Sequence, residues 1–204
     1  MARCLPAVVL LLVWPLASAA VERSYAVDPG QSTVEVDVAK AGLFSLALHD
    51  HRFRAELWEG TVRFDPNRPQ ALEAVITVDA ASLHEHEPGL SASDEREVDR
   101  TARGPQLLDV ATHPTVRFEA HGATLRREGD RLTGSLEGTL MLRGRSRRVR
   151  LPVQARVDGA RLEAQGTLSF AQTAFGIRPY RRALGAVAVK DEVTVRFRLR
   201  AEAR

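Results

Sequence analysis

The sequence predicts a single all-β domain, either a sandwich of two sheets or a closed barrel of about eight strands. Apolar and polar side chains alternate with a period of two through most of the chain, which is the pattern of half-buried antiparallel strands. Turn residues separate these runs, and no helical segments alternate with them. Closure into a barrel removes exposed sheet edges, and about eight strands leave an interior that can hold one small ligand.

The N-terminal half contains four alternating segments. They are residues 32–38, 61–64, 74–78 and 115–120. In the first of them three valines alternate with Thr33, Glu35 and Asp37. Each segment is therefore expected to present one apolar face to the interior and one polar face to water.

The alternation is clearer in the C-terminal half. The apolar faces there comprise Leu132, Leu136, Leu140 and Leu142; Val149, Leu151, Val153, Ala155 and Val157; Leu162, Ala164, Leu168 and Phe170; and Val193, Val195, Phe197 and Leu199. Gly134, Gly138 and Gly166 fall on the same faces, where they permit strand bending or leave room inside. An interior filled by side chains remains an equal alternative at this point.

Residues 93–110 interrupt the alternation. The segment is charged and ends in Leu107-Leu108-Asp109-Val110. It predicts a short helix and loop across one mouth of the barrel.

The first twenty residues have the features of a secretory signal. Arg3 precedes an apolar core, residues 7–14, and the small residues 17–20 offer a cleavage site. We expect cleavage to leave 21–204 as one mature domain in the periplasm or outside the cell. Cys4 is the only cysteine and would leave with the signal, so the mature domain is expected to lack disulfides and cysteine nucleophiles.

Charge excludes one class of partner and suggests another. Without Arg3 the mature chain has 28 basic and 26 acidic side chains, which is weak support for nucleic acid, and we expect no such partner. The basic run 143–150 could contact anionic head groups at a membrane surface, although hairpin arginines that stay in water are the preferred interpretation. Arg178, Arg181 and Arg182, beside Tyr180, are the better candidates for a phosphate-bearing head group.

Two His-x-His pairs are the sharpest local feature. On a regular strand residues two apart share a face, so His49 and His51, or His84 and His86, could both point inward. Four imidazoles at one mouth could bind zinc, copper or iron, which makes metal binding and delivery the alternative function. Two other interpretations stay open: the histidines hydrogen-bond a ligand head group, or His84 and His86 lie in a solvated loop.

The sequence gives little support for catalysis. It contains neither a Gly-x-Ser-x-Gly nucleophile turn nor a His-Glu-x-x-His zinc motif. Asp50 should face away from its flanking histidines, and Glu85 and Glu87 are interpreted as solvated. The protein is therefore expected not to be an enzyme.

Five segments in order resemble the YceI-like family. They are residues 25–36, 58–66, 107–118 and 138–151, and a closing pair made of Thr173-Ala174-Phe175-Gly176-Ile177 and Lys190-Asp191-Glu192-Val193. The family consists of exported, lipocalin-like β-barrels that bind polyisoprenoids and related long lipids. The resemblance implies an apolar tunnel, no required cofactor and an exported location.

A carrier or store of a long-chain lipid is accordingly the leading function. The expected ligand-binding residues are Phe44, Phe53, Leu57, Phe64, Phe118, Leu140, Leu168, Phe170 and Phe175, with Arg178. The sequence leaves open which lipid is bound and the oligomeric state, a homodimer included.

Overall fold

A computed structural model describes residues 22–41, 50–65, 68–182 and 187–204. The strands are β1 (Arg23–Val27), β2 (Thr33–Ala41), β3 (His51–Ala55), β4 (Trp58–Asp65), β5 (Arg68–Asp79), β6 (Leu83–Glu85), β7 (Thr115–Glu128), β8 (Arg131–Leu142), β9 (Arg145–Asp158), β10 (Arg161–Ala171), β11 (Arg181–Arg182) and β12 (Val187–Ala203). The helices are α1 (Ala92–Arg103) and the short 3₁₀ helices η1 (Pro29–Gln31), η3 (Ala80–Ser82) and η4 (Gln172–Phe175).

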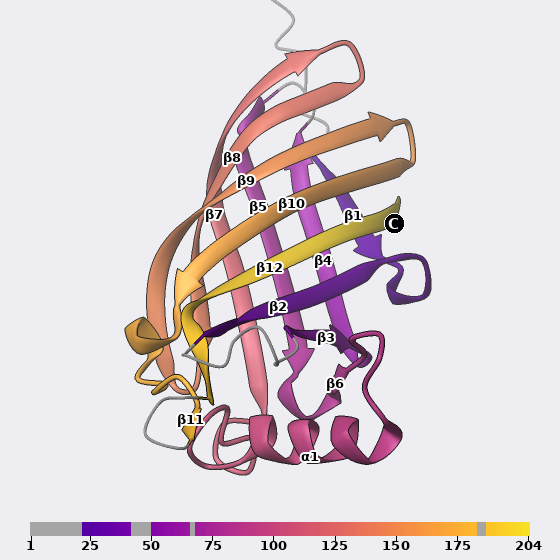
Figure 1. Ribbon diagram of the computed structural model, residues 1–204. Coiled ribbons are helices and arrows are strands. Elements are labelled where there is room, and N and C mark those ends of the chain that lie inside the picture. The colour runs from indigo at the N-terminus through magenta and orange to yellow at the C-terminus, as the bar shows by residue number, and fades with distance from the viewer. Residues whose placement is uncertain (1–21, 42–49, 66–67, 183–186) are drawn as a thin grey trace, which may run out of the picture.

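Eight antiparallel strands close into a barrel, as the sequence predicts (Figure 1). Their order around the ring is β1, β4, β5, β7, β8, β9, β10 and β12, and the pairing of β1 with β12 closes it. The expected inward faces are confirmed in the hairpins of the C-terminal half: Leu136, Leu151 and Val195, for example, all line the interior.

β1 and β2 pair with different parts of the same strand, β12. β1 pairs with the end of β12, with Tyr25 opposite Ala203. The chain then passes through η1, which begins at Pro29 and is capped by the side chain of the preceding residue, Asp28. After η1 it continues along β12 as β2. Because β2 pairs with β3, and β3 with β6, these strands extend the wall beyond β1.

The wall opens between β9 and β10. Their ladder ends at the pair Val153–Gly166, next to Pro152, which has no N–H to continue it. η4 and the residues after it fill the gap, and there Phe175 and Ile177 are almost fully buried. The two halves of the family-like closing pair meet here: Thr173 donates from its backbone N–H and its hydroxyl to the Asp191 carboxylate.

The two inward glycines in the middle of the barrel leave no empty space. A Cβ on Gly138 would lie 2.8 Å from the Phe118 ring, and one on Gly166 would lie 2.7 Å from the Phe197 ring. Both glycines therefore allow a phenyl ring to pack flat against the neighbouring strand.

The ends of the barrel differ. At the end with the β7–β8 and β9–β10 turns (Figure 1), Tyr25 and Phe64 are 0% and 1% exposed and their rings stack with centroids 5.6 Å apart. Arg23 ties β1 to the β9–β10 turn by donating to the Gly159 carbonyl, 2.7 Å away. This end is closed.

α1 lies across the opposite end (Figure 1). It confirms the helix expected within 93–110, and residues 104–110 form the loop. Ser91 caps its N-terminus. The Asp99 carboxylate attaches it to β6 by accepting from the Glu85 N–H at 2.8 Å. Within the described residues, no helix has the length and apolar character needed to cross a bilayer.

Candidate functional site: an apolar cavity with one polar end

The barrel encloses a cavity of about 420 Å³, within the range that holds small-molecule ligands. Its wall is contributed by every strand of the ring except β1, together with β2, β3 and α1. Most of the lining side chains are valine, leucine, isoleucine, alanine or phenylalanine. The interior is therefore hollow and apolar. The alternative from the sequence, an interior filled by side chains, does not hold.

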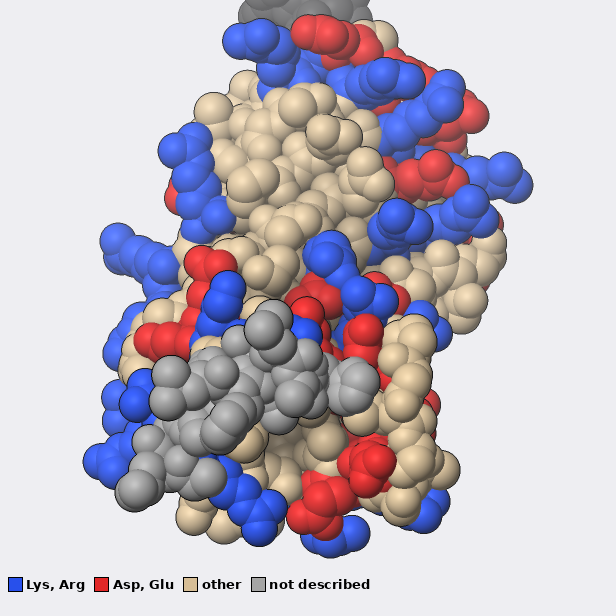
Figure 2. Space-filling view, viewed as in Figure 1, with Lys and Arg blue, Asp and Glu red and all other residues tan. Residues whose placement is uncertain are grey.

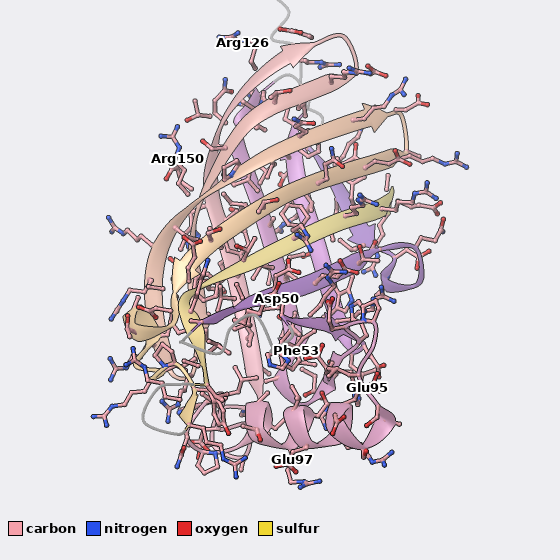
Figure 3. All side chains as sticks on the ribbon, viewed as in Figure 1. Asp50, Phe53, Glu95, Glu97, Arg126 and Arg150 are labelled. Carbon is pink, nitrogen blue, oxygen red and sulfur yellow. The ribbon has the colours of Figure 1, made fainter. Side chains whose placement is uncertain are left out.

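Six of the expected wall residues line this cavity. They are Phe53, Phe64, Phe118, Leu140, Leu168 and Phe170. Figure 3 marks Phe53 on β3, near the end of the barrel that α1 covers. Phe44 lies outside the described residues.

Leu57 was expected to line the cavity, and that prediction is wrong. Its side chain is 63% exposed. The parity of Phe53 and Ala55 does not extend to it, because β3 ends at Ala55 and the chain turns before β4 begins at Trp58.

Phe175 and Arg178 also do not contribute to the cavity wall. Phe175 is 1% exposed and belongs to a second apolar cluster, where it meets Phe170 edge to face with centroids 5.1 Å apart. It fills the gap between β9 and β10, one layer behind the lumen. Arg178 is exposed and follows directly after Phe175–Ile177, the residues that fill this gap.

The polar lining residues are confined to one end. In the described chain they are His51, Glu97, Thr101, Gln172, Tyr180 and Arg182. They come from β3, α1, η4 and β11 with the residue before it, which lie at the α1 end of the barrel (Figure 1). The site thus has an apolar interior, a closed apolar end and a polar mouth. Sequence parity missed Glu97, Thr101 and Gln172, because they lie on helices.

His51 faces the cavity as expected, and its partner is Glu85. Its Nδ1 lies 2.8 Å from Glu85 Oε2. The other carboxylate oxygen of Glu85 accepts from the backbone N–H groups of Arg52, His86 and Glu87. Burial by itself raises the pKa of Glu85, but these hydrogen bonds outweigh it and hold the pKa below its ordinary value. Glu85 is thus a buried structural acceptor, and the prediction that it is solvated is wrong.

Replacement of this carboxylate should change acid stability. We expect Glu85→Gln to lower the free energy of unfolding at neutral pH by about 1–3 kcal/mol, since the amide cannot replace a charged acceptor of several N–H groups. A depressed pKa stabilises the fold above the unfolded-state pKa and loses this contribution as pH falls through the folded-state pKa. Urea unfolding from neutral pH to about pH 3 should therefore show the two proteins converging.

Glu59→Gln, at an exposed position on β4, is the matched control and should follow the wild type throughout. A constant difference between wild type and Glu85→Gln at all pH values would contradict the assigned role of the charge.

His84 points away from the lumen, contrary to the parity predicted for it. η3 interrupts the strand, and alternation restarts with Leu83 and Glu85 facing inward. The Nδ1 of His84 lies 2.8 Å from Asp99 Oδ2. This contact joins β6 to α1.

His86 likewise lies outside the lumen. Its Nε2 is 3.9 Å from Glu35 Oε1, in an outer-surface group of charges that includes the pairs Arg54–Glu35 and Arg52–Asp37. His51 therefore faces the cavity from β3 while His84 and His86 face outward. No three His, Cys, Asp or Glu side chains of the described residues are grouped so that they could hold a metal ion. His49 lies outside those residues.

Comparison with known proteins identifies the family. Residues 25–201 match the family model described as the YceI-like domain. This chain belongs to the YceI-like family.

The solved structures that it resembles include other YceI-like barrels. BcnA of Burkholderia cenocepacia is 21% identical with a TM-score of 0.66, and the match covers 85% of this chain and 98% of BcnA. A polyisoprenoid binding domain from Saccharophagus degradans, implicated in plant cell wall breakdown, is 17% identical with a TM-score of 0.63 and coverage of 88% and 98%. The YCEI protein of Campylobacter jejuni is 13% identical with a TM-score of 0.56 and coverage of 74% and 83%. None of the curated proteins matches the sequence.

Proposed function

We propose that this YceI-like protein binds one long-chain apolar molecule, a polyisoprenoid or similar lipid, in its lumen, and that it carries or stores this molecule after export. The observation that carries the proposal is the 420 Å³ apolar cavity, in which all polar lining side chains of the described residues lie at one end. Such a site fits an amphipathic ligand whose tail reaches the Tyr25–Phe64 end. Its head group would meet Tyr180 and Arg182.

The relatives support this ligand class. One similar structure is itself described as a polyisoprenoid binding domain. A binding role without catalysis is consistent with the cavity, whose polar residues stand at the mouth rather than around a buried reacting centre. We propose export on the signal-like residues 1–20, which lie outside the described part of the chain.

The energetics require a long chain. Burial contributes about 0.8 kcal/mol per methylene, or about 8 kcal/mol gross for ten. Ordering the ligand offsets several kcal/mol of this, so ten methylenes give only about millimolar affinity. About fifteen methylenes, or about 12 kcal/mol gross, are needed for about micromolar affinity. A short chain would not overcome the same cost.

Binding should accordingly strengthen with chain length until the cavity is full. For a series of unbranched alcohols we expect Kd to fall by up to about fourfold per added methylene and then to level off. Fluorescence competition or calorimetry with delipidated protein measures the slope, and native mass spectrometry of gently purified protein should show a bound lipid. An affinity independent of chain length, together with a persistently empty barrel, would refute the proposal.

Metal delivery, the alternative from the sequence, has no grouped ligand set among the described residues. No observation favours it over lipid binding.

A further inference from the structure

The mouth of the cavity is bordered on one side by arginines. Two segments contribute them: the β8–β9 turn with the start of β9, and the residues that lead from the end of η4 into β11. We call Arg145, Arg147, Arg178, Arg181 and Arg182 the basic rim. All of them are exposed, and Arg182 also lines the cavity.

The two segments are joined in space. Arg143 donates from one guanidinium nitrogen to the Gly176 carbonyl at 2.8 Å and from the other to the Pro105 carbonyl at 2.6 Å. The Arg145 guanidinium occupies the space where a Cβ on Gly176 would lie. Gly176 has a φ of 73°, which favours glycine in any case. The two rim segments therefore lie against each other at Gly176, next to the residues that fill the gap between β9 and β10.

The charge of the basic rim is not neutralised within the described chain. None of its five arginines forms an ion pair with an acidic side chain there. The segments 143–150 and 176–182 contain no aspartate or glutamate. The outer barrel wall differs, since Arg150 pairs with Glu137 and Arg196 with Asp37.

The nearby acids do not cancel this charge. Asp191, on the bulge of β12 beside η4, already accepts two hydrogen bonds from Thr173. Glu95 and Glu97 lie on α1 (Figure 3). In the space-filling view Lys and Arg side chains gather along the lower left edge, while the lower right carries acidic side chains together with Lys or Arg (Figure 2). Acidic and basic side chains are therefore mixed on the α1 side, whereas the two rim segments carry basic side chains alone.

We propose that the basic rim docks the protein on an anionic lipid bilayer, with the mouth of the cavity against the membrane. Guanidinium groups are weakly hydrated and bind phosphate oxygens in a bidentate manner. A surface of several such cations is attracted to anionic lipid head groups and is screened by salt. Docking by this side places the opening of the apolar cavity where a lipid tail can leave the bilayer without crossing water.

Vesicle sedimentation tests the docking independently of lumen binding. The probe is vesicles of phosphatidylcholine with phosphatidylglycerol, compared with phosphatidylcholine alone. We expect binding to the anionic vesicles only, and its loss at high salt. The triple variant Arg145→Glu/Arg147→Glu/Arg181→Glu should weaken partitioning by about a hundredfold, because each cation near the surface contributes about fivefold.

The matched control reverses three exposed arginines at the closed end: Arg126→Glu/Arg131→Glu/Arg161→Glu. Figure 3 marks Arg126 there, far from α1. It has the same net charge as the rim variant and should bind vesicles like the wild type. Equal loss in both variants, equal binding to neutral vesicles, or no vesicle binding would overturn the proposal. Chain binding in the lumen, measured in parallel, should survive in both variants, so failure of docking is distinct from failure of the proposed function.

Discussion

Ala164→Phe should abolish most binding of long-chain ligands while the protein stays folded. Ala164 lines the cavity from β10 and is only partly buried, so a phenyl ring there extends into the lumen. If the ring takes the place of about four methylenes of the ligand, the loss is about 3 kcal/mol. This corresponds to more than about a hundredfold in Kd. Calorimetric titration of delipidated protein measures it.

Thr167→Phe is the matched control, since it adds the same ring to the outer face of the same strand, where Thr167 is exposed. It should leave Kd within about twofold of wild type, because a solvent-facing substitution usually changes energies by about 0.5 kcal/mol or less. If the two variants bind the ligand equally well, the lumen is not the binding site.

Phe64→Ala should have the largest effect on stability. Phe64 is 1% exposed, stacks on Tyr25 and forms part of the closed end. Truncation of a buried phenylalanine costs about 3–5 kcal/mol, including the cavity that it leaves. For a domain of this size the melting temperature should fall by about 10 °C, as calorimetry or circular dichroism would show.

The same substitution should lengthen the cavity at its closed end. In the series of alcohols the plateau of affinity should therefore move to longer chains. Leu57→Ala, at a 63% exposed position, is the control and should change neither stability nor chain length preference. A Phe64→Ala protein as stable as the wild type would show that this end is not tightly packed.

The barrel and most of its wall could be predicted because the alternation is unbroken over long strands. In β8 and β12 every apolar residue on the expected face, from Leu132 to Leu142 and from Val193 to Leu199, lines the cavity. A period of two leaves only two possible assignments for a strand, and burial of one face selects between them.

Predictions failed where the chain leaves the strand for a few residues. η3 resets the alternation before β6, so His84 turns outward and Glu85 inward. The turn after β3 exposes Leu57 in the same way. The sequence contains a clue for η3, since Asp79 caps it by accepting from the Ala81 N–H, and an aspartate that bonds the backbone two residues further on is a common turn former.

Other features depend on contacts between distant segments. Phe175 fills a wall gap whose position is set by Pro152 of another strand, and the polar mouth is assembled from β3, α1, η4 and the region of β11. No local pattern shows that these segments meet. The closed end is equally non-local, because Tyr25 and Phe64 come from different strands.

Photo-crosslinking with an end-labelled polyprenol tests the central claim most directly. A probe with a diazirine at the tail end should label peptides containing Phe64, Leu132 or Leu162, which line the cavity near its closed end. A probe labelled next to its head group should instead modify peptides with Thr101, Tyr180 or Arg182. Labelling of outer-face residues alone, or the two patterns reversed, would contradict a one-ended lumen that holds its ligand tail inward.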